Sequence, residues 1–392
     1  MSTDFDAIVV GLGAMGSCAL EALARRGARV LGIDRHDPPH AFGSSHGGSR
    51  VIRLSYFEHA DYVPLLREAY EGFDRLSRDG GEPLRFENGL VVAGAPGSEV
   101  TAGMRRSAEI HGLAIDAIDG RELVRRFPQF SVPTAWEAVY ESRGGFVRPE
   151  STIRTALSLA VRRGAEILRS TPVVAWGARD GRAWVDTPRG RLEGRALVLA
   201  GGAWMPQLLA DETERTPSSR LVPTRETIVW IDDAADPSWS HDRMPVWLFD
   251  RGVHAAAYGI PTFTSMGAPR GLKVALHGAG PPTDPDAPER PVDDRAVRET
   301  VEAVREFLPA AQGRSVVAAK HCLYTMSDDG DFLVGLSRSR PEVVLAAGFS
   351  GHGFKFAPVM GEVLADLALT RTTRRPIGFL SPSRTIPPEG GR

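Results

Sequence analysis

Apolar positions at the start of the chain change from a strand pattern to a helix pattern and back. A short β-branched run covers residues 6–10, helix-forming residues cover 14–26, and a second apolar run covers 29–33 and ends at Asp34. Short apolar runs on either side of a helical segment are typical of a βαβ unit in a parallel sheet. We therefore expect the chain to open with such a unit.

A longer amphipathic pattern follows. Tyr62 begins a series of apolar residues at helical spacing that continues to Leu76, so we expect a helix that ends near Gly80-Gly81. The dipeptide Asn88-Gly89 then separates two strand-like runs, 84–87 and 90–93. Asn-Gly favours a hairpin turn, so a hairpin is predicted here at the start of a more antiparallel region.

The remaining patterns alternate between the two kinds of region. We expect a helix at 150–164, strands at 172–176, 182–187 and 196–200, alternating strands within 221–280, a proline-rich loop at 281–291, a helix at 293–308, a strand at 343–347 and a last helix with Pro358 in its first turn. The predicted fold class is α/β, with a Rossmann-like nucleotide domain interleaved with a domain of antiparallel sheet and helices. The first domain is assigned to residues 1–85, 146–220 and 320–392, and the second to 86–145 and 221–319.

Composition adds constraints on partners and location. A chain of 392 residues is long enough for about two domains of roughly 150 residues. Lysine and arginine total 47 against 49 acidic residues, so no charge excess favours nucleic acid or an acidic membrane, and a small-molecule partner is expected. The two cysteines, Cys18 and Cys322, predict no disulfide framework, and neither a leader peptide nor a membrane span is recognisable. We expect a soluble, unprocessed cytoplasmic protein.

The first βαβ unit carries a glycine pattern. Gly11 and Gly13 allow a tight turn and close approach to a pyrophosphate, Gly16 allows the helix to pack on the strand, and Asp34 can accept hydrogen bonds from ribose hydroxyls. Glycine triplets also occur in ordinary loops, but a preceding strand, a following helix and the acid at this spacing favour a dinucleotide. The pattern does not distinguish FAD from NAD.

Residues 37–53 have few apolar anchors and carry His46, Arg50 and Arg53 among glycines. Such a loop suits an anionic cofactor or substrate, but a solvated basic loop has the same composition. The choice depends on the wider context.

That context is a set of ordered motifs across the chain. Together they make the chain resemble the monomeric sarcosine oxidase and N-methyltryptophan oxidase family, within the D-amino-acid-oxidase-like flavoproteins. The matching motifs are VVGLGAMG (9–16), DPPH (37–40), GSSHGGSRVIR (43–53), YVPL (62–65), YGIP (258–261), GLK (271–273), CLYT (322–325) and AAGFSGHGFKF (346–356).

The resemblance implies an FAD-binding domain and a thioether from Cys322 to the 8α-methyl of FAD. A lone cysteine is otherwise most often a small buried apolar residue, which is our interpretation of Cys18. Residues 200–204 resemble a second flavin-domain signature. The expected cofactor-binding positions are Gly11, Gly13, Gly16, Asp34, Ser44, Val173, Gly202, Cys322, Gly351 and Gly353.

The resemblance also implies substrate-binding and catalytic positions. Arg53 and Lys355 match the pair that holds the substrate carboxylate, a role suited to a forked guanidinium beside an ammonium. Lys273 matches a lysine that promotes the reaction of reduced flavin with O2, where a cation stabilises superoxide. Taken singly, each of these cations could be an exposed surface residue. The other expected positions are His46 and Arg50 near the flavin, and His277, Tyr258 and Tyr324 in the substrate pocket.

Some residues depart from the family pattern. Ser45 replaces a common histidine, Gly48-Ser49 replaces an Asp-Thr pair, and the segment between Tyr258 and Lys273 is a few residues longer. These positions border the expected pocket, so the reaction class stands and the substrate stays open.

The resulting hypothesis is an FAD-dependent amine oxidase. It would oxidise a secondary or N-methyl amino acid, by hydride transfer to flavin, to an imine that hydrolyses, and reduce O2 to H2O2. The alternatives are a dehydrogenase that passes electrons to a carrier and a non-catalytic flavin-binding assembly factor. The family suggests a monomer, and no metal is expected.

Overall fold

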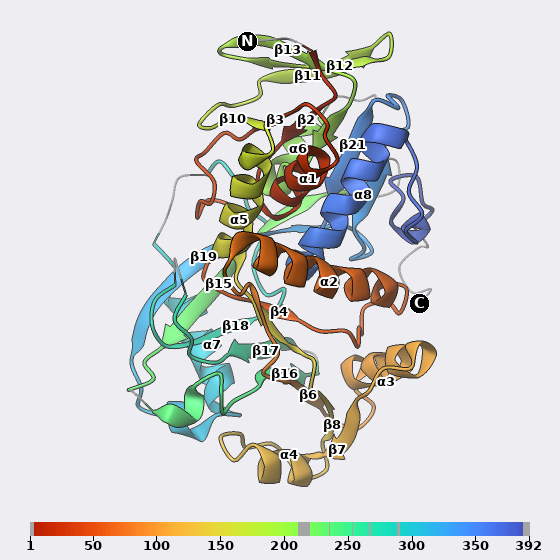
Figure 1. Cartoon of the computed structure of the whole chain (residues 1–392). Coiled ribbons are helices and arrows are strands. Elements are labelled where there is room, and N and C mark those ends of the chain that lie inside the picture. The colour runs from red at the N-terminus through yellow and green to blue at the C-terminus, as the bar shows by residue number, and fades with distance from the viewer. Residues whose placement is uncertain are drawn as a thin grey trace.

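A six-stranded sheet lies in the upper half of the molecule (Figure 1). The computed structural model describes residues 4–210, 220–234, 236–252, 254–265, 268–287 and 291–386. All neighbouring strands of this sheet are parallel except the last pair, so the predicted α/β class is confirmed. The strand order is β10 (Glu166–Leu168), β3 (Val30–Ile33), β2 (Ala7–Val10), β14 (Leu197–Leu199), β21 (Val343–Ala347) and β20 (Leu333–Leu336).

Two different layers cover the faces of this sheet, because both faces of its strands are apolar. In β2, Ala7 and Val9 pack with the helices, whereas Ile8 and Val10 pack on the opposite side. The helical layer consists of α1 (Ala14–Arg25), α5 (Pro149–Arg162) and α8 (Ala357–Thr370), with α2 (Tyr62–Gly80) against α5 and α8. The opposite layer is a four-stranded sheet of β1 (Asp4–Phe5), β13 (Gly190–Gly194), β12 (Arg182–Thr187) and β11 (Ala175–Arg179).

A buried carboxylate joins three of the helices. Glu21 of α1 is 1% exposed and accepts two hydrogen bonds from Arg75 of α2, at 2.9 and 2.8 Å, and one of 2.6 Å from Arg163, which follows α5. Removing one member of a buried ionic cluster leaves the other charges without compensation.

We expect Glu21→Gln to lower the free energy of unfolding by about 2 kcal/mol, because Arg75 and Arg163 lose their shortest ion pairs and keep only the longer ones with Asp79 and Glu362. Urea unfolding followed by circular dichroism measures this. Glu193→Gln is the control, because Glu193 is 45% exposed and its ion pair with Arg182 spans 3.6 Å. Equal midpoints for both variants would contradict a structural role for the Glu21 cluster.

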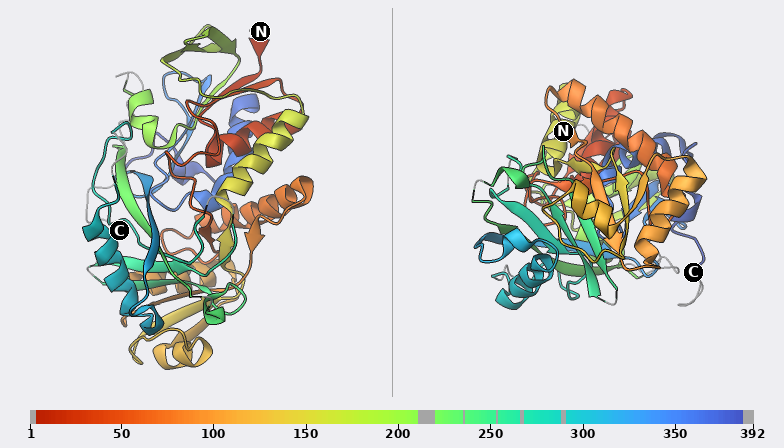
Figure 2. Two further views of the ribbon diagram at one scale, coloured as in Figure 1. Left: turned by 90° about the vertical axis from the view of Figure 1, so that its left-hand side faces the viewer. Right: turned by 90° about the horizontal axis from the view of Figure 1, so that it is seen from below.

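An eight-stranded sheet forms the lower half of the molecule (Figures 1 and 2). Its alternating pattern separates two faces: Val229 and Val274 pack toward α7 (Asp294–Arg305), whereas Trp230 and Lys273 point to the other side. The strand order is β19 (Val316–Met326), β15 (Val222–Ile231), β18 (Leu272–Leu276), β17 (His254–Ile260), β16 (Val246–Arg251), β6 (Leu90–Gly94), β8 (Glu137–Glu141) and β7 (Asp116–Asp119).

Small elements complete the fold. A three-stranded sheet contains β4 (Arg50–Ile52), β9 (Gly145–Val147) and β5 (Arg85–Phe86). Among the described residues, the remaining helical segments are α3 (Glu99–His111), α4 (Gly120–Arg126), α6 (Met205–Leu208), η1 (Gly202–Trp204), η3 (Pro237–Trp239), η4 (Pro309–Ala311), η5 (Phe354–Phe356) and η6 (Gly378–Leu380). In the described part of the chain, none of the helices has the length and apolar character needed to cross a bilayer.

The predicted hairpin at Asn88-Gly89 is wrong. The strands on either side, β5 and β6, belong to different sheets, because β5 pairs with β9 whereas β6 pairs with β8 and β16. Gly89 has the left-handed φ of 83° that the dipeptide favours, but its N–H donates to Gly144 across a corner between the sheets.

The strand expected at 172–176 begins only at Ala175, since residues 172–174 lie in the loop that lines the cavity described below. The division into two discontinuous domains stays a prediction.

Candidate active site

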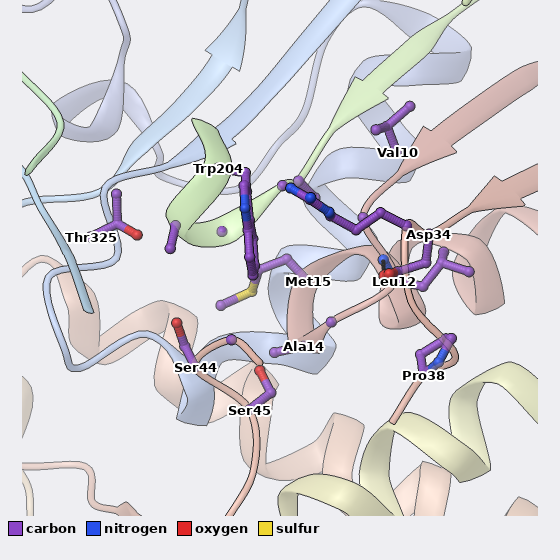
Figure 3. A pocket seen from close by; sticks show the side chains of 18 of the residues that line it. Val10, Leu12, Ala14, Met15, Asp34, Pro38, Ser44, Ser45, Trp204 and Thr325 are labelled. Carbon is purple, nitrogen blue, oxygen red and sulfur yellow. Dashed lines mark hydrogen bonds between the residues drawn. The ribbon is translucent and has the colours of Figure 1, made fainter. Parts of the chain in front are cut away.

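The main cavity lies where the parallel strands of the six-stranded sheet end, and its volume is about 660 Å³. Loops after β2, β3, β14 and β21 supply much of its lining, as expected of a ligand site at the carboxyl ends of parallel strands. Figure 3 shows Asp34 and Thr325 on opposite sides of this cavity, with Met15 between them. The cavity therefore spans from the first βαβ unit to strand β19.

One end of the cavity fits a pyrophosphate. Gly11 has φ of 86°, and a Cβ there would lie 2.4 Å from the carbonyl oxygen of Ala200. Gly13 precedes α1, and no side chain of the described residues caps this helix or places an acid in its first turn. The first N–H groups and the helix dipole are thus available to an anion. Gly16 lies outside the lining and serves packing, since its Cβ would meet the Gly11 carbonyl oxygen at 1.7 Å.

Asp34 lines the same end of the cavity. Its carboxylate accepts hydrogen bonds from the N–H groups of Leu12 at 2.7 Å and His36 at 2.8 Å. Burial opposes the charge, but His40 and these N–H groups outweigh it and lower the pKa of Asp34. A charged carboxylate at this position suits a ribose hydroxyl.

A loop of the proline-rich segment reaches this end as well. Asp286 accepts a hydrogen bond of 2.7 Å from Trp204 Nε1 and forms an ion pair of 2.9 Å with Arg35. Both Trp204 and Arg35 line the cavity. A loop between β18 and α7 thus contacts the wall of the nucleotide end, a contact that composition alone did not indicate.

The other end of the cavity is lined by a guanidinium that contacts a buried thiol. Arg50 donates to the main-chain oxygen of Ser44 at 2.7 Å, and its Nη2 lies 3.3 Å from Cys322 Sγ. Ser44, Arg50 and Tyr324 line the cavity, whereas Cys322 on β19 is 3% exposed and its Sγ lies 3.6 Å from the main-chain oxygen of Ser44. The predicted tether is therefore adjacent to the cavity.

Lys273 is buried beside the loop of residues 43–53, which contains Ser44 and Arg50. Its Nζ donates to the carbonyl oxygens of Gly47 at 3.1 Å and Ser49 at 2.6 Å, and lies 5.9 Å from the ring centre of Trp230. Burial and then Arg50 lower the pKa of Lys273 well below its usual range. The ammonium is therefore closer to losing its proton than a surface lysine.

The loop of residues 43–53 is not a solvated basic loop. His46 is 4% exposed, and both of its ring nitrogens are without a partner among the described residues. Burial, Arg50 and Lys273 lower the pKa of His46 to about 3, so the ring is neutral. Glu150 holds the loop by accepting hydrogen bonds from the N–H groups of Gly47 and Gly48.

The predicted carboxylate clamp consists of Arg53 and Lys355, both buried. Arg53 Nη2 donates to both carboxylate oxygens of Glu58 at 2.7 Å. Burial opposes the charge of Glu58, but Arg53 lowers the pKa of Glu58 to about 2. Arg53 thus already binds one carboxylate, a partner that we did not predict although an acid five residues later in the same loop was a usable signal.

Lys355 is the second residue of the predicted clamp. Its Nζ donates to the main-chain oxygen of His352 at 2.8 Å. Burial lowers the pKa of Lys355 to about 7, and the nearby Arg53 adds to this effect. The charge of this lysine is therefore sensitive to pH near neutrality.

Neutral side chains lie near the tyrosines of the site. His277 Nδ1 is 3.3 Å from the hydroxyl of Tyr324, and burial lowers the pKa of His277 to about 4. Burial also raises the pKa of Tyr258, to about 12. Glu226, which the sequence did not single out, is buried opposite Cys322 in the β15–β19 register, and burial raises its pKa. The site thus contains neutral hydrogen-bonding groups as well as cations.

The structure brings the predicted residues into two sets. Residues that line the cavity are Gly11, Gly13, Asp34, Ser44, Arg50, Val173, Gly202, Tyr324, Gly351 and Gly353. Gly16, His46, Arg53, Tyr258, Lys273, His277, Cys322 and Lys355 lie outside this lining, and contacts such as Arg50–Cys322 and His277–Tyr324 connect the two sets. The described residues contain no cluster of three or more histidine, cysteine or acidic side chains suited to a metal ion.

Comparison with known proteins identifies similar chains over nearly the full length. Residues 6–367 match the family described as FAD dependent oxidoreductase. The chain is 38% identical over 387 residues to a monomeric sarcosine oxidase from Streptomyces avermitilis, with 98% of both chains covered. It is 32% identical over 373 residues to an N-methyl-L-tryptophan oxidase from Salmonella arizonae, with 94% of this chain and 95% of the relative covered. An L-proline dehydrogenase from P. horikoshii has the same fold, with a TM-score of 0.84, 22% identity and 98% of both chains covered.

Proposed function

Since the chain belongs to the family of FAD-dependent oxidoreductases, as its motifs predicted, we propose that it is an oxidase of secondary or N-methyl amino acids. The observation that carries the proposal is the buried pair Arg53 and Lys355, because Arg53 Nη2 already donates to both oxygens of a carboxylate. A buried cation pair of this kind suits the carboxylate of an amino acid.

The residues of the clamp bind and orient the substrate. The substrate carboxylate replaces that of Glu58 on Arg53 and takes a second contact from Lys355. His277 and Tyr324 are both neutral and would lie near the amine of the substrate. Because they add no negative charge that would stabilise a protonated amine, the amine can stay deprotonated.

FAD, when bound, supplies the ring that oxidises the carbon–nitrogen bond and returns the electrons to O2. The cavity fits this group because its glycine turn and uncapped helix suit the pyrophosphate, and Asp34 suits the ribose. Arg50 lines the end of the cavity where the flavin ring would lie, and His46 belongs to the same loop. Lys273 would provide positive charge for the reaction with O2, and Cys322 would hold the flavin covalently. We further infer that the protein is a cytoplasmic monomer.

Peroxide release tests this function. We expect H2O2 in equal amount to the amino acid consumed for at least one of sarcosine, N-methyltryptophan, pipecolate and proline. The matching amines without a carboxylate should react at least about a hundredfold more slowly, because they lose a charge-assisted two-point contact. Anaerobic bleaching of the flavin without peroxide in air would indicate a dehydrogenase, and no bleaching by any of the four would indicate the non-catalytic alternative.

A further inference from the structure

Tyr56 contacts both cations of the carboxylate clamp. Arg53 Cζ lies 4.3 Å from the centre of the Tyr56 ring, and Lys355 Nζ lies 3.5 Å from its hydroxyl oxygen. The tyrosine is 1% exposed, so it has little freedom to move away. One buried side chain therefore contacts both groups of the proposed clamp.

The direction of the Tyr56 hydroxyl follows from its second partner. The hydroxyl oxygen is 2.6 Å from His352 Nδ1, and His352 Nε2 is 3.0 Å from the carbonyl oxygen of Gly330. A carbonyl only accepts, so Nε2 carries the ring proton, and Nδ1 of the neutral ring accepts the Tyr56 proton. The lone pairs of Tyr56 are then left to accept a hydrogen bond from Lys355.

His352 also contacts Lys355 directly, through its main-chain oxygen at 2.8 Å. The lysine is thus held from two directions by one histidine, once by its backbone and once through the tyrosine. We propose that Tyr56 and His352 are positioning residues that fix Lys355 relative to Arg53, so that both cations can bind one carboxylate. This inference rests on the proposed function.

The charged and titratable groups around Lys355 differ in the pH at which they change charge. Glu58, with its pKa of about 2, stays ionised near neutral pH. His352 and His277, each with its pKa lowered to about 4 by burial, stay neutral. Burial raises the pKa of Tyr56 well above its usual value, so it also stays neutral. Burial raises the pKa of Glu141, which accepts hydrogen bonds from the N–H groups of Leu54 and Ser55.

The test is binding of methoxyacetate to the oxidised holoenzyme by calorimetry between pH 6 and 9. This probe has a carboxylate and no ionisable nitrogen, so the pH dependence reports on the protein. Wild type should bind more weakly as the pH rises through about 7, because Lys355 loses its proton. Lys355→Met should bind methoxyacetate weakly at every pH. Loss of the pH dependence in this variant assigns the wild-type midpoint to Lys355.

Tyr56→Phe should lower the pH midpoint of methoxyacetate binding and weaken binding about fivefold at pH 8. The Lys355 ammonium loses a hydrogen-bond acceptor in this variant, while the aromatic ring of residue 56 is kept. His352→Leu should act like Tyr56→Phe, whereas His352→Asn should restore much of the affinity, because its Oδ1 can accept the Tyr56 proton. Tyr62→Phe is the matched control. Tyr62 packs 5.1 Å from Tyr56 between ring centres, but its hydroxyl donates to Asp331.

The outcomes separate the two proposals. If wild type binds no methoxyacetate, or Lys355→Met binds like wild type, the carboxylate clamp itself is wrong and the positioning role is overturned with it. If the clamp behaves as expected but Tyr56→Phe titrates like Tyr62→Phe, only the positioning role is overturned. Retained flavin absorbance and an unchanged melting temperature establish that each variant is folded.

Discussion

Replacing Lys273 by methionine is expected to slow the reaction with O2 by about two to three orders of magnitude, while anaerobic reduction by substrate stays close to wild type. Electron transfer to O2 produces negative charge, and the Lys273 ammonium is the buried cation held beside the cavity loop by Gly47 and Ser49. The same rate should fall as the pH rises, because burial lowers the pKa of Lys273 and the ammonium is lost earlier than in water. Stopped-flow mixing measures the two half-reactions separately.

Lys320→Met is the matched control for this experiment. Lys320 Nζ lies at the same 5.9 Å from the Trp230 ring centre as Lys273 Nζ, but Lys320 is only half-buried. We expect a much smaller effect on the oxygen reaction. Equal effects of the two substitutions would mean that net positive charge, and not the position of Lys273, controls the reaction.

Replacing Cys322 by serine is expected to abolish covalent retention of the flavin. After acid precipitation the yellow colour should stay with wild-type protein and move entirely to the supernatant with the variant, because a hydroxyl is a far weaker nucleophile than a thiolate. Mass spectrometry of the denatured chain should show the added flavin on wild type alone. Arg50 Nη2 lies 3.3 Å from the sulfur, and a neighbouring cation favours the thiolate form of a cysteine.

Cys18→Ala provides the control, because Cys18 is buried in α1 among core residues and burial raises the pKa of its thiol to about 12. It should keep the flavin attached. Loss of attachment in this variant, or free flavin from the wild type, would exclude Cys322 as the attachment site.

Local patterns predicted the elements whose neighbours are close in sequence. The first βαβ unit is correct because its strands, its turn and Asp34 lie within one short segment. The helix from Tyr62 also ends at Gly80 with Gly81 in the left-handed conformation, as expected. The error at Asn88-Gly89 arose because that dipeptide fixes a turn but not a partner, and the pairing of β5 depends on distant β9.

The residues of the candidate site also fall into those with a local sequence signal and those without one. Motifs identified Arg53, Lys355 and Cys322, because each lies within a recognisable run of residues. The bond between Tyr56 and His352 joins positions 296 residues apart, and only the folded chain brings them into contact. Hydrogen-bond partners of this kind carry no local signal in a single sequence.

The alternation of the eight-stranded sheet has a consequence for how such enzymes diversify. Cys322 on β19 and Lys273 on β18 lie on either side of β15, so their separation depends on backbone hydrogen bonding and register and not on any loop. Arg53 and Glu58, in contrast, belong to the segment between β4 and α2. Insertions and substitutions in that segment can therefore change the surroundings of Arg53, while the spacing between Cys322 and Lys273 stays fixed by the strand pairing.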